Sequence, residues 1–423
     1  MKHSIYILFI AMLFIASSCN KDEVITTDST PNPDDNHTEI IEPEIPYVSV
    51  AGTNTPIIMS IESSKTFVAT VAETSLTTTY TWNLDGVWVS DTLTYLFKAK
   101  KVGDYELQFI ARNLDGADSV NFIVTVIDAA PEGKYYRPKS ENSSADWNRV
   151  YEYTPAPGQF INETLTGGFS GDETSPQKAI EYAEERLRAG RFVSLGGFGG
   201  YIIVGFDHSI DNNDSYDFAI KGNSFSGSSE PGVVWVMQDE NGDGEPNDTW
   251  YELKGCETGA ETTIQNYAVT YYKPSEPNMP VQWSDNLGNS GQIDYLSDYH
   301  KQEFYYPNWI STDSYTLYGT RLEARNYDKS GNGTLWIQPE YEWGYADNFS
   351  PIDRLTNESN NNAQQNSNHF DIANAIDNSG NAVELKYIDF IKVQCAVNAK
   401  SGWTGELSTE VFGFSDYSLI AHP

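Results

Sequence analysis

One loop in the sequence carries side chains whose types and spacing could bind a metal ion. Asp239, Asn241 and Asp243 stand at alternate positions, and Gly244 follows them. An EF-type calcium loop takes side-chain oxygens from positions 1, 3 and 5, and a glycine at position 6 makes its turn. The same residues also suit a turn without metal, because Asp, Asn and Gly are common turn formers.

The second half of such a calcium loop is incomplete here. Position 12, which would be a bidentate Glu, is Trp250, so Asp248 or Glu252 would have to replace it. The flanking runs GVVWVMQ and TWYELKG indicate strands, which places the loop at the tip of a β-hairpin. We expect Ca2+ in a structural role. The predicted ligands are Asp239, Asn241, Asp243, Glu245 and Asp248.

Motifs for catalysis are weak. The sequence has no metal-binding His pair and no GxSxG nucleophile motif. The glycine run 196–200 precedes a strand-like YIIVGFD, whereas a phosphate-binding loop would precede a helix. Acidic pairs for glycoside hydrolysis are available among 60 Asp and Glu residues, but a sequence does not give their separation. We therefore expect a protein that is not an enzyme, and a glycoside hydrolase is the least favoured alternative.

Aromatic side chains in loop-like segments offer a second kind of site. The segments YYPNWISTDS, EWGYADN and KSGWTGE contain the candidate ligand-binding residues Trp309, Trp343, Tyr345 and Trp403. Aromatic faces, with polar neighbours, could stack on a flat ligand or on a sugar ring. For each residue the alternative is burial in a β-sandwich core.

The elements that must position these residues are mostly strands. Alternating runs separated by turns predict a small sandwich over residues 46–128, and further strand-like runs fill residues 134–423. One short helix is predicted after the N-cap Ser175, with Pro176 in its first turn and Gly190 at its end. The predicted fold class is all-β: an immunoglobulin-like sandwich, then a larger β-sandwich or jelly-roll-like domain that this helix covers.

The N-terminal residues predict that the protein is exported from the cytoplasm. Residues 1–18 have a positive start, a short apolar run and a small-residue exit, which is typical of a signal peptide. Residues 19–45 are rich in Pro, Thr and acids, as in a disordered tether. Cys256 and Cys395 could pair in an oxidising exterior, and sequence leaves this open. The net charge of −34 argues against binding to nucleic acid.

Three resemblances refine this account. Small residues before Cys19 resemble the lipobox of bacterial lipoproteins, and the following NKDE resembles the signal that sends Bacteroidetes-type lipoproteins to the outer face of the outer membrane. These imply lipidation of Cys19, and a lipid anchor as the membrane contact. Tyr80, Trp82, Gly103 and Tyr105 lie in patterns that resemble the PKD family of immunoglobulin-like modules.

The large domain has its own resemblance. Its segments SLGGFGGYIIVGFDHSI, SEPGVVWVMQDENGDGEPNDTWYEL, EWGYADN and GWTGELSTEVFG are similar to PKD-containing surface lipoproteins of gut Bacteroidetes. Members of that family accompany corrinoid (vitamin B12) uptake through TonB-dependent outer-membrane transporters. The resemblance implies capture of a corrinoid for such a transporter. Glycan binding and a structural or adhesive role are the alternatives.

Overall fold

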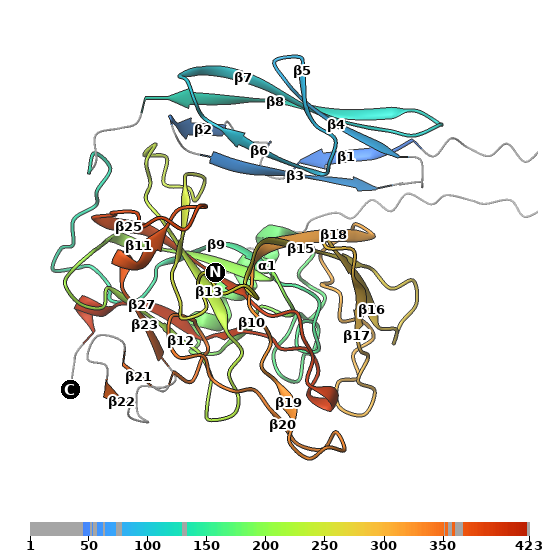
Figure 1. The fold of residues 1–423 in the computed structure, drawn as a ribbon, viewed down its shortest axis with the longest axis vertical. Helices are drawn as coiled ribbons and strands as arrows, with labels where there is room; N and C mark the ends of the chain where they lie inside the picture. The colour runs from blue at the N-terminus through green and yellow to red at the C-terminus, as the bar shows by residue number, and fades with distance from the viewer. Residues whose placement is uncertain are drawn as a thin grey trace, which may run out of the picture. The chain divides into compact units, whose positions relative to one another are not determined.

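Strands dominate the structure, a computed structural model that describes residues 45–50, 53, 57–61, 64–72, 78–128, 133–350, 352–353, 358–359 and 367–420. The described residues contain a single α-helix and many strands, so the predicted all-β class is confirmed (Figure 1). None of their helices is long and apolar enough to cross a membrane. The predicted lipidation site, Cys19, lies outside the described residues.

The N-terminal strands form two sheets around one core. One sheet contains β1 (Tyr47–Val50), β3 (Ser64–Ala72) and β6 (Thr94–Lys98). The other contains β2 (Ile57–Ser60), β8 (Ala117–Ile127), β7 (Gly103–Arg112), β4 (Thr79–Leu84) and β5 (Val87–Ser90). Trp82 is fully buried among Phe67, Phe109 and Phe122. Trp82 is therefore a central residue of the core between the two sheets.

A six-stranded antiparallel sheet is the centre of the remaining chain. Its order is β24 (Ala375–Ile376), β14 (Trp250–Leu253), β13 (Gly232–Met237), β25 (Tyr387–Cys395), β11 (Tyr201–Asp211) and β9 (Arg149–Thr154). β25 and β11 are buried along almost their whole length, because both of their faces are covered. Their continuous apolar runs, rather than alternating ones, follow from that position.

Smaller sheets surround the central one. A four-stranded sheet contains β17 (Ser290–Ile293), β16 (Val281–Asp285), β15 (Ile264–Tyr272) and β18 (Ser314–Arg321). A three-stranded sheet contains β23 (Ser367–Phe370), β12 (Phe218–Lys221) and β27 (Gly413–Asp416). The strand pairs are β10 (Val193–Ser194) with β26 (Glu410–Val411), β19 (Tyr327–Asp328) with β20 (Trp336–Ile337), and β21 (Ile352–Asp353) with β22 (Glu358–Ser359). The 3-10 turns are η1 (Ile372–Asn374), η2 (Gly402–Thr404) and η3 (Tyr417–Leu419).

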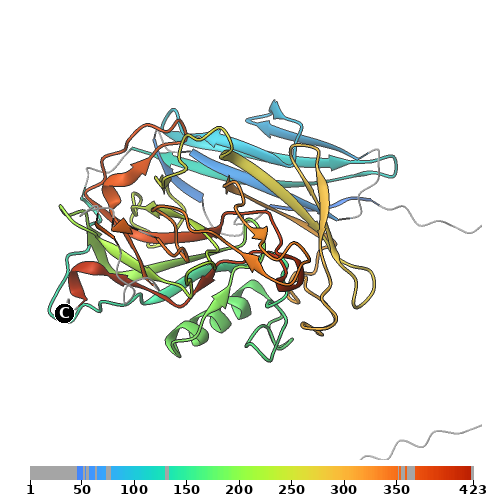
Figure 2. The same cartoon turned by 60° about the horizontal axis from the view of Figure 1, so that its bottom comes forward.

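The helix α1 (Pro176–Arg188) forms where the sequence predicts it and packs against β9. The Ser175 hydroxyl accepts a hydrogen bond from the Lys178 amide, which satisfies one of the free N–H groups at the helix start. Ala179, Ala183 and Leu187 make its buried stripe. Figure 2 shows α1 on the outside of the strands that it covers.

The glycine run is a site of close backbone packing. A Cβ atom on Gly196 would lie 2.0 Å from the Ala156 carbonyl oxygen, and one on Gly200 would lie 1.8 Å from the Leu195 carbonyl oxygen. Gly196 also has a φ of +68°, which other residues rarely adopt. The run therefore makes a tight bend before β11, as its position before a strand predicts.

Candidate functional site

The predicted calcium loop connects β13 and β14, which pair as an antiparallel hairpin. Its first ligand candidate, Asp239, uses both carboxylate oxygens within the loop. Oδ1 accepts a hydrogen bond from the Gly242 amide at 2.6 Å, and Oδ2 accepts one from the Gly244 amide at 3.0 Å. Both glycines have positive φ, which lets the chain turn back toward Asp239.

The other candidate ligands of this loop also have partners in the protein. The Asn241 side-chain amide donates to Asp243 and to Asn247, and Glu245 lies 3.5 Å from Arg149. Asp248 is buried, and its Oδ2 accepts from the Glu240 amide at 2.8 Å, whereas its Oδ1 has no hydrogen-bond partner in the described part of the chain. Hydrogen bonds within the protein thus close most of the turn, and bound Ca2+ in the loop stays a prediction.

The four predicted ligand-binding aromatics have different environments. Tyr345 is in the core, 2% exposed, and its hydroxyl accepts from the Glu257 amide. Trp309 is half-buried between two core clusters, and Trp343 is also half-buried. Trp403 differs from the other three, because 44% of it is exposed. Of the four predicted residues, Trp403 is therefore the one whose ring a large ligand can contact at the surface.

Trp403 has an aromatic neighbour that the sequence did not single out. Tyr299, 57% exposed, lies with its ring centroid 5.2 Å from that of Trp403, and the two ring planes are inclined by 42°. Tyr299 ends a turn in which its amide donates to the Leu296 carbonyl. Trp403 lies in η2. The two loops thus present adjoining aromatic faces to solvent.

Hydrogen bonds brace both loops. On one side, the Ser401 amide donates to the Gly405 carbonyl at 2.7 Å, and the Asn326 side chain donates to the Lys400 carbonyl at 2.7 Å. On the other side, His300 lies 2.7 Å from the Glu163 carboxylate, next to Tyr299. We call Tyr299 and Trp403 the aromatic pair. Its support indicates that the pair is positioned before any ligand arrives.

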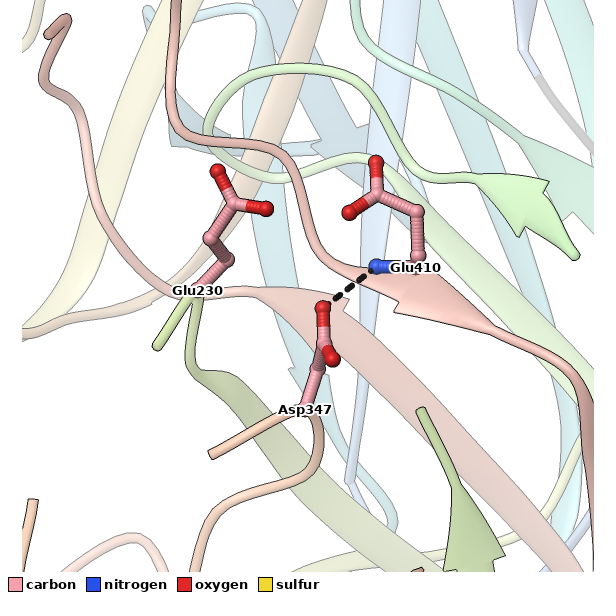
Figure 3. Close-up of side chains that lie close together, drawn as sticks. All are labelled: Glu230, Asp347 and Glu410. Atoms are coloured by element: carbon pink, nitrogen blue, oxygen red, sulfur yellow. Dashed lines mark hydrogen bonds between the residues drawn. The ribbon is translucent and has the colours of Figure 1, made fainter. Parts of the chain in front are cut away.

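A second feature is a group of three carboxyl side chains from distant parts of the chain. Glu230 precedes β13, Asp347 follows the buried Tyr345–Ala346 segment, and Glu410 lies in β26. One oxygen of each lies within 4.8 Å of those of the other two, and among the described residues no other group of His, Cys, Asp and Glu side chains meets this criterion. Figure 3 shows carboxylate oxygens of Glu230 and Glu410 facing each other, with Asp347 below them. We call these residues the carboxylate cluster.

Burial dominates the chemistry of this cluster. Asp347 and Glu410 are 1% and 3% exposed. Burial and the charge of Glu230 raise the pKa of Asp347 to about 8, and burial raises the pKa of Glu230 to about 7. The pKa of Glu410 also rises, through burial and the charges of Glu230 and Asp347. Sequence reasoning missed this cluster, although its members stand in three of the segments that carry the family resemblance.

The two cysteines do not form the disulfide that the sequence left open. Both are free: Cys395 is buried in β25, and Cys256 is half-buried in a loop after β14. The Cys395 thiol donates to the Leu407 carbonyl at 3.4 Å, whereas the Cys256 thiol donates to the Glu257 carboxylate at 3.4 Å. Each sulfur atom therefore has its own surroundings and its own acceptor.

Comparisons with known proteins give only distant likenesses. No protein-family model matches the sequence, and no curated protein matches it. Among solved structures, a quinonprotein alcohol dehydrogenase-like protein from Bacteroides thetaiotaomicron VPI-5482 is 11% identical, with a TM-score of 0.17 over 59% of this chain and 50% of the other. Carbohydrate-binding modules of the β-sandwich superfamily are 10% identical, with a TM-score of 0.18 over 88% and 98%. A SusE-like protein is 7% identical, with a TM-score of 0.17 over 87% and 96%. Scores this low carry no inference about function.

Proposed function

We propose that this protein is a non-enzymatic surface lipoprotein that binds a glycan through the Tyr299–Trp403 aromatic pair. The observation that carries the proposal is the exposure of both rings side by side, 5.2 Å apart between centroids. Cys19 would carry the lipid that holds the protein at the outer face of the outer membrane.

Two adjoining aromatic rings suit a sugar chain for physical reasons. A pyranose ring has an apolar C–H face that can lie on an aromatic ring, and burial of that face removes apolar surface of both partners from water. The angle of 42° between the rings offers two surfaces of different orientation, which suits successive sugar units of a bent chain better than one flat ligand.

Polar groups in the two loops that carry the pair can serve sugar hydroxyls. Lys400 and Asp294 form an ion pair, with 48% and 38% of their side chains exposed. A hydroxyl group can bond to either partner, since it both donates and accepts. A few such groups around an aromatic surface give orientation to a ligand that stacking alone would leave loosely specified.

The test is a binding screen with the soluble chain, residues 20–423. Affinity electrophoresis in gels that contain a β-glucan, a xyloglucan, a galactomannan or an α-glucan should show retardation by at least one polysaccharide. Calorimetry with cyanocobalamin is the parallel arm, because the family resemblance implies a corrinoid. No retardation by any glycan, together with heat from cyanocobalamin, would replace this proposal with corrinoid capture. Absence of binding in both arms would also overturn it.

A further inference from the structure

The carboxylate cluster has the composition of a site for a hard cation. Its members offer oxygen atoms only, from Glu230, Asp347 and Glu410, within 4.8 Å of one another. Ca2+, Mg2+ and Mn2+ prefer carboxylate oxygens, whereas zinc and copper sites usually include His or Cys. We propose that these three residues bind a divalent cation, and that the ion is Ca2+.

The main chain holds the three carboxyls together before any ion binds. The Glu230 amide donates to the Asp347 carbonyl at 3.0 Å, and the Glu410 amide donates to Asp347 Oδ2 at 2.9 Å (Figure 3). Asp347 Oδ1 accepts from the Asn223 amide at 2.8 Å. Asp347 is thus fixed by backbone donors and links the other two, which reduces the entropy lost when a ligand binds.

An unsatisfied oxygen points independently to a missing partner. Glu410 is 3% exposed, and its Oε1 has no hydrogen-bond partner in the described part of the chain. A buried polar atom without a partner costs about 1–3 kcal/mol, and more when it is charged. Because the Glu410 carboxyl faces Glu230, an ion between them would satisfy this oxygen.

The charge of the cluster, which has no positively charged partner among the described side chains, also favours a bound cation. Within the described residues, no Lys, Arg or His forms an ion pair with Glu230, Asp347 or Glu410. Buried carboxylates without a cation repel one another and are expensive to desolvate. Protons and a divalent cation are the two ways to reduce this charge. A calcium ion does so while it also coordinates several oxygens at once.

Binding would join three separate segments. Glu410 lies in β26, seven positions beyond Trp403, while Glu230 precedes β13 and Asp347 follows the buried Tyr345–Ala346 segment. A cation would therefore fasten the end of the segment that carries Trp403 to the large domain. The site does not depend on the proposed glycan function, and it can be tested without a glycan.

Calcium titration in a background in which the 239–248 loop lacks a candidate ligand tests the site. The parent is D243A in the soluble chain (residues 20–423), since that change removes a side-chain oxygen of the other predicted calcium site. After EDTA treatment and dialysis, calorimetry with CaCl2 should show binding to D243A. Adding E410Q should weaken it by roughly tenfold or more, as expected for loss of one of three carboxylate ligands. E230Q should act in the same direction, and circular dichroism should show that each variant is folded.

Thermal unfolding adds two expected results for the Tm, one with Ca2+ and one in EDTA. Ca2+ should raise the Tm of the parent, because a ligand that binds the folded state stabilises it. In EDTA, E410Q should have a Tm equal to or above that of the parent, because it removes a buried acid that has no ion-pair partner and whose Oε1 has no hydrogen-bond partner in the described part of the chain. No heat and no Tm shift with CaCl2 in the parent would overturn the proposal. So would unchanged Ca2+ affinity in both E410Q and E230Q, and tighter binding of Mg2+ would overturn the assignment to calcium.

Discussion

Tyr299 and Trp403, which come from two separate loops, place their ring centroids 5.2 Å apart while both remain largely exposed. Each stands on a turn that is closed by backbone hydrogen bonds, which hold in place the two loops that carry the rings.

The two rings should act as one surface. We expect Tyr299→Ala and Trp403→Ala each to weaken glycan binding by about tenfold or more, as is common for central aromatic contacts. The double variant should lose less than the sum of the two free energies, because each ring also positions the other. Tyr299→Phe keeps the ring and serves as the control. Strict additivity, measured by calorimetry on all four proteins, would show that the rings act separately.

Asp217 should make stability depend on pH. It is fully buried, and desolvation raises its pKa from 3.8 to about 6, although the Ile372 and Asn213 amides both donate to it. Because the folded pKa is the higher one, its stabilising contribution is complete below pH 3.8 and is lost as pH rises through 6. The shift corresponds to about 3 kcal/mol in the free energy of unfolding.

Urea unfolding at pH 4 and pH 7.5 measures this effect. Asp217→Asn cannot titrate, so the variant should lose about 2 kcal/mol less than the wild type over that interval, because part of the effect lies below pH 4. The comparison between the two proteins removes the contribution of other buried acids. An identical pH dependence in both would contradict the assigned role of Asp217.

Thiol chemistry tests the cysteine environments. In the soluble chain (residues 20–423), which lacks Cys19, denaturant should release two reactive thiols, because Cys256 and Cys395 are free. In the native protein Cys395 should react at least about a hundred times more slowly than Cys256, since it is fully buried and a raised pKa lowers its thiolate fraction. Cys395→Ser is the matched control for the slow phase. An intact mass two protons short of the reduced chain would show a disulfide instead.

Local patterns account for much of the fold and little of the site. Alternating residues around Trp82 predict strands that pair, and Ser175 with Pro176 predicts the start of α1, because these signals act over a few residues. Tyr345 and Trp403 follow similar glycine-containing segments, yet one is buried and the other exposed. What separates them is the packing of remote chain segments, which neighbouring residues do not encode.

The carboxylate cluster is a second example of a site that local sequence patterns do not predict. Glu230, Asp347 and Glu410 each stand in a segment without a recognisable metal motif. They meet because hydrogen bonds from the Glu230 and Glu410 amides to Asp347 join the three segments. The 239–248 loop has the opposite property: its spacing is visible in sequence, and its hairpin position was predicted correctly from its flanks.

The most direct test of glycan binding at the aromatic pair compares two exposed tryptophans. Trp403 is 44% exposed in the aromatic pair, whereas Trp88 is 61% exposed on β5 and has no role in it. Affinity electrophoresis should show that Trp403→Ala abolishes retardation by the polysaccharide that retards the wild type, while Trp88→Ala migrates like the wild type. Retardation of Trp403→Ala equal to that of the wild type would contradict glycan binding at the Tyr299–Trp403 pair.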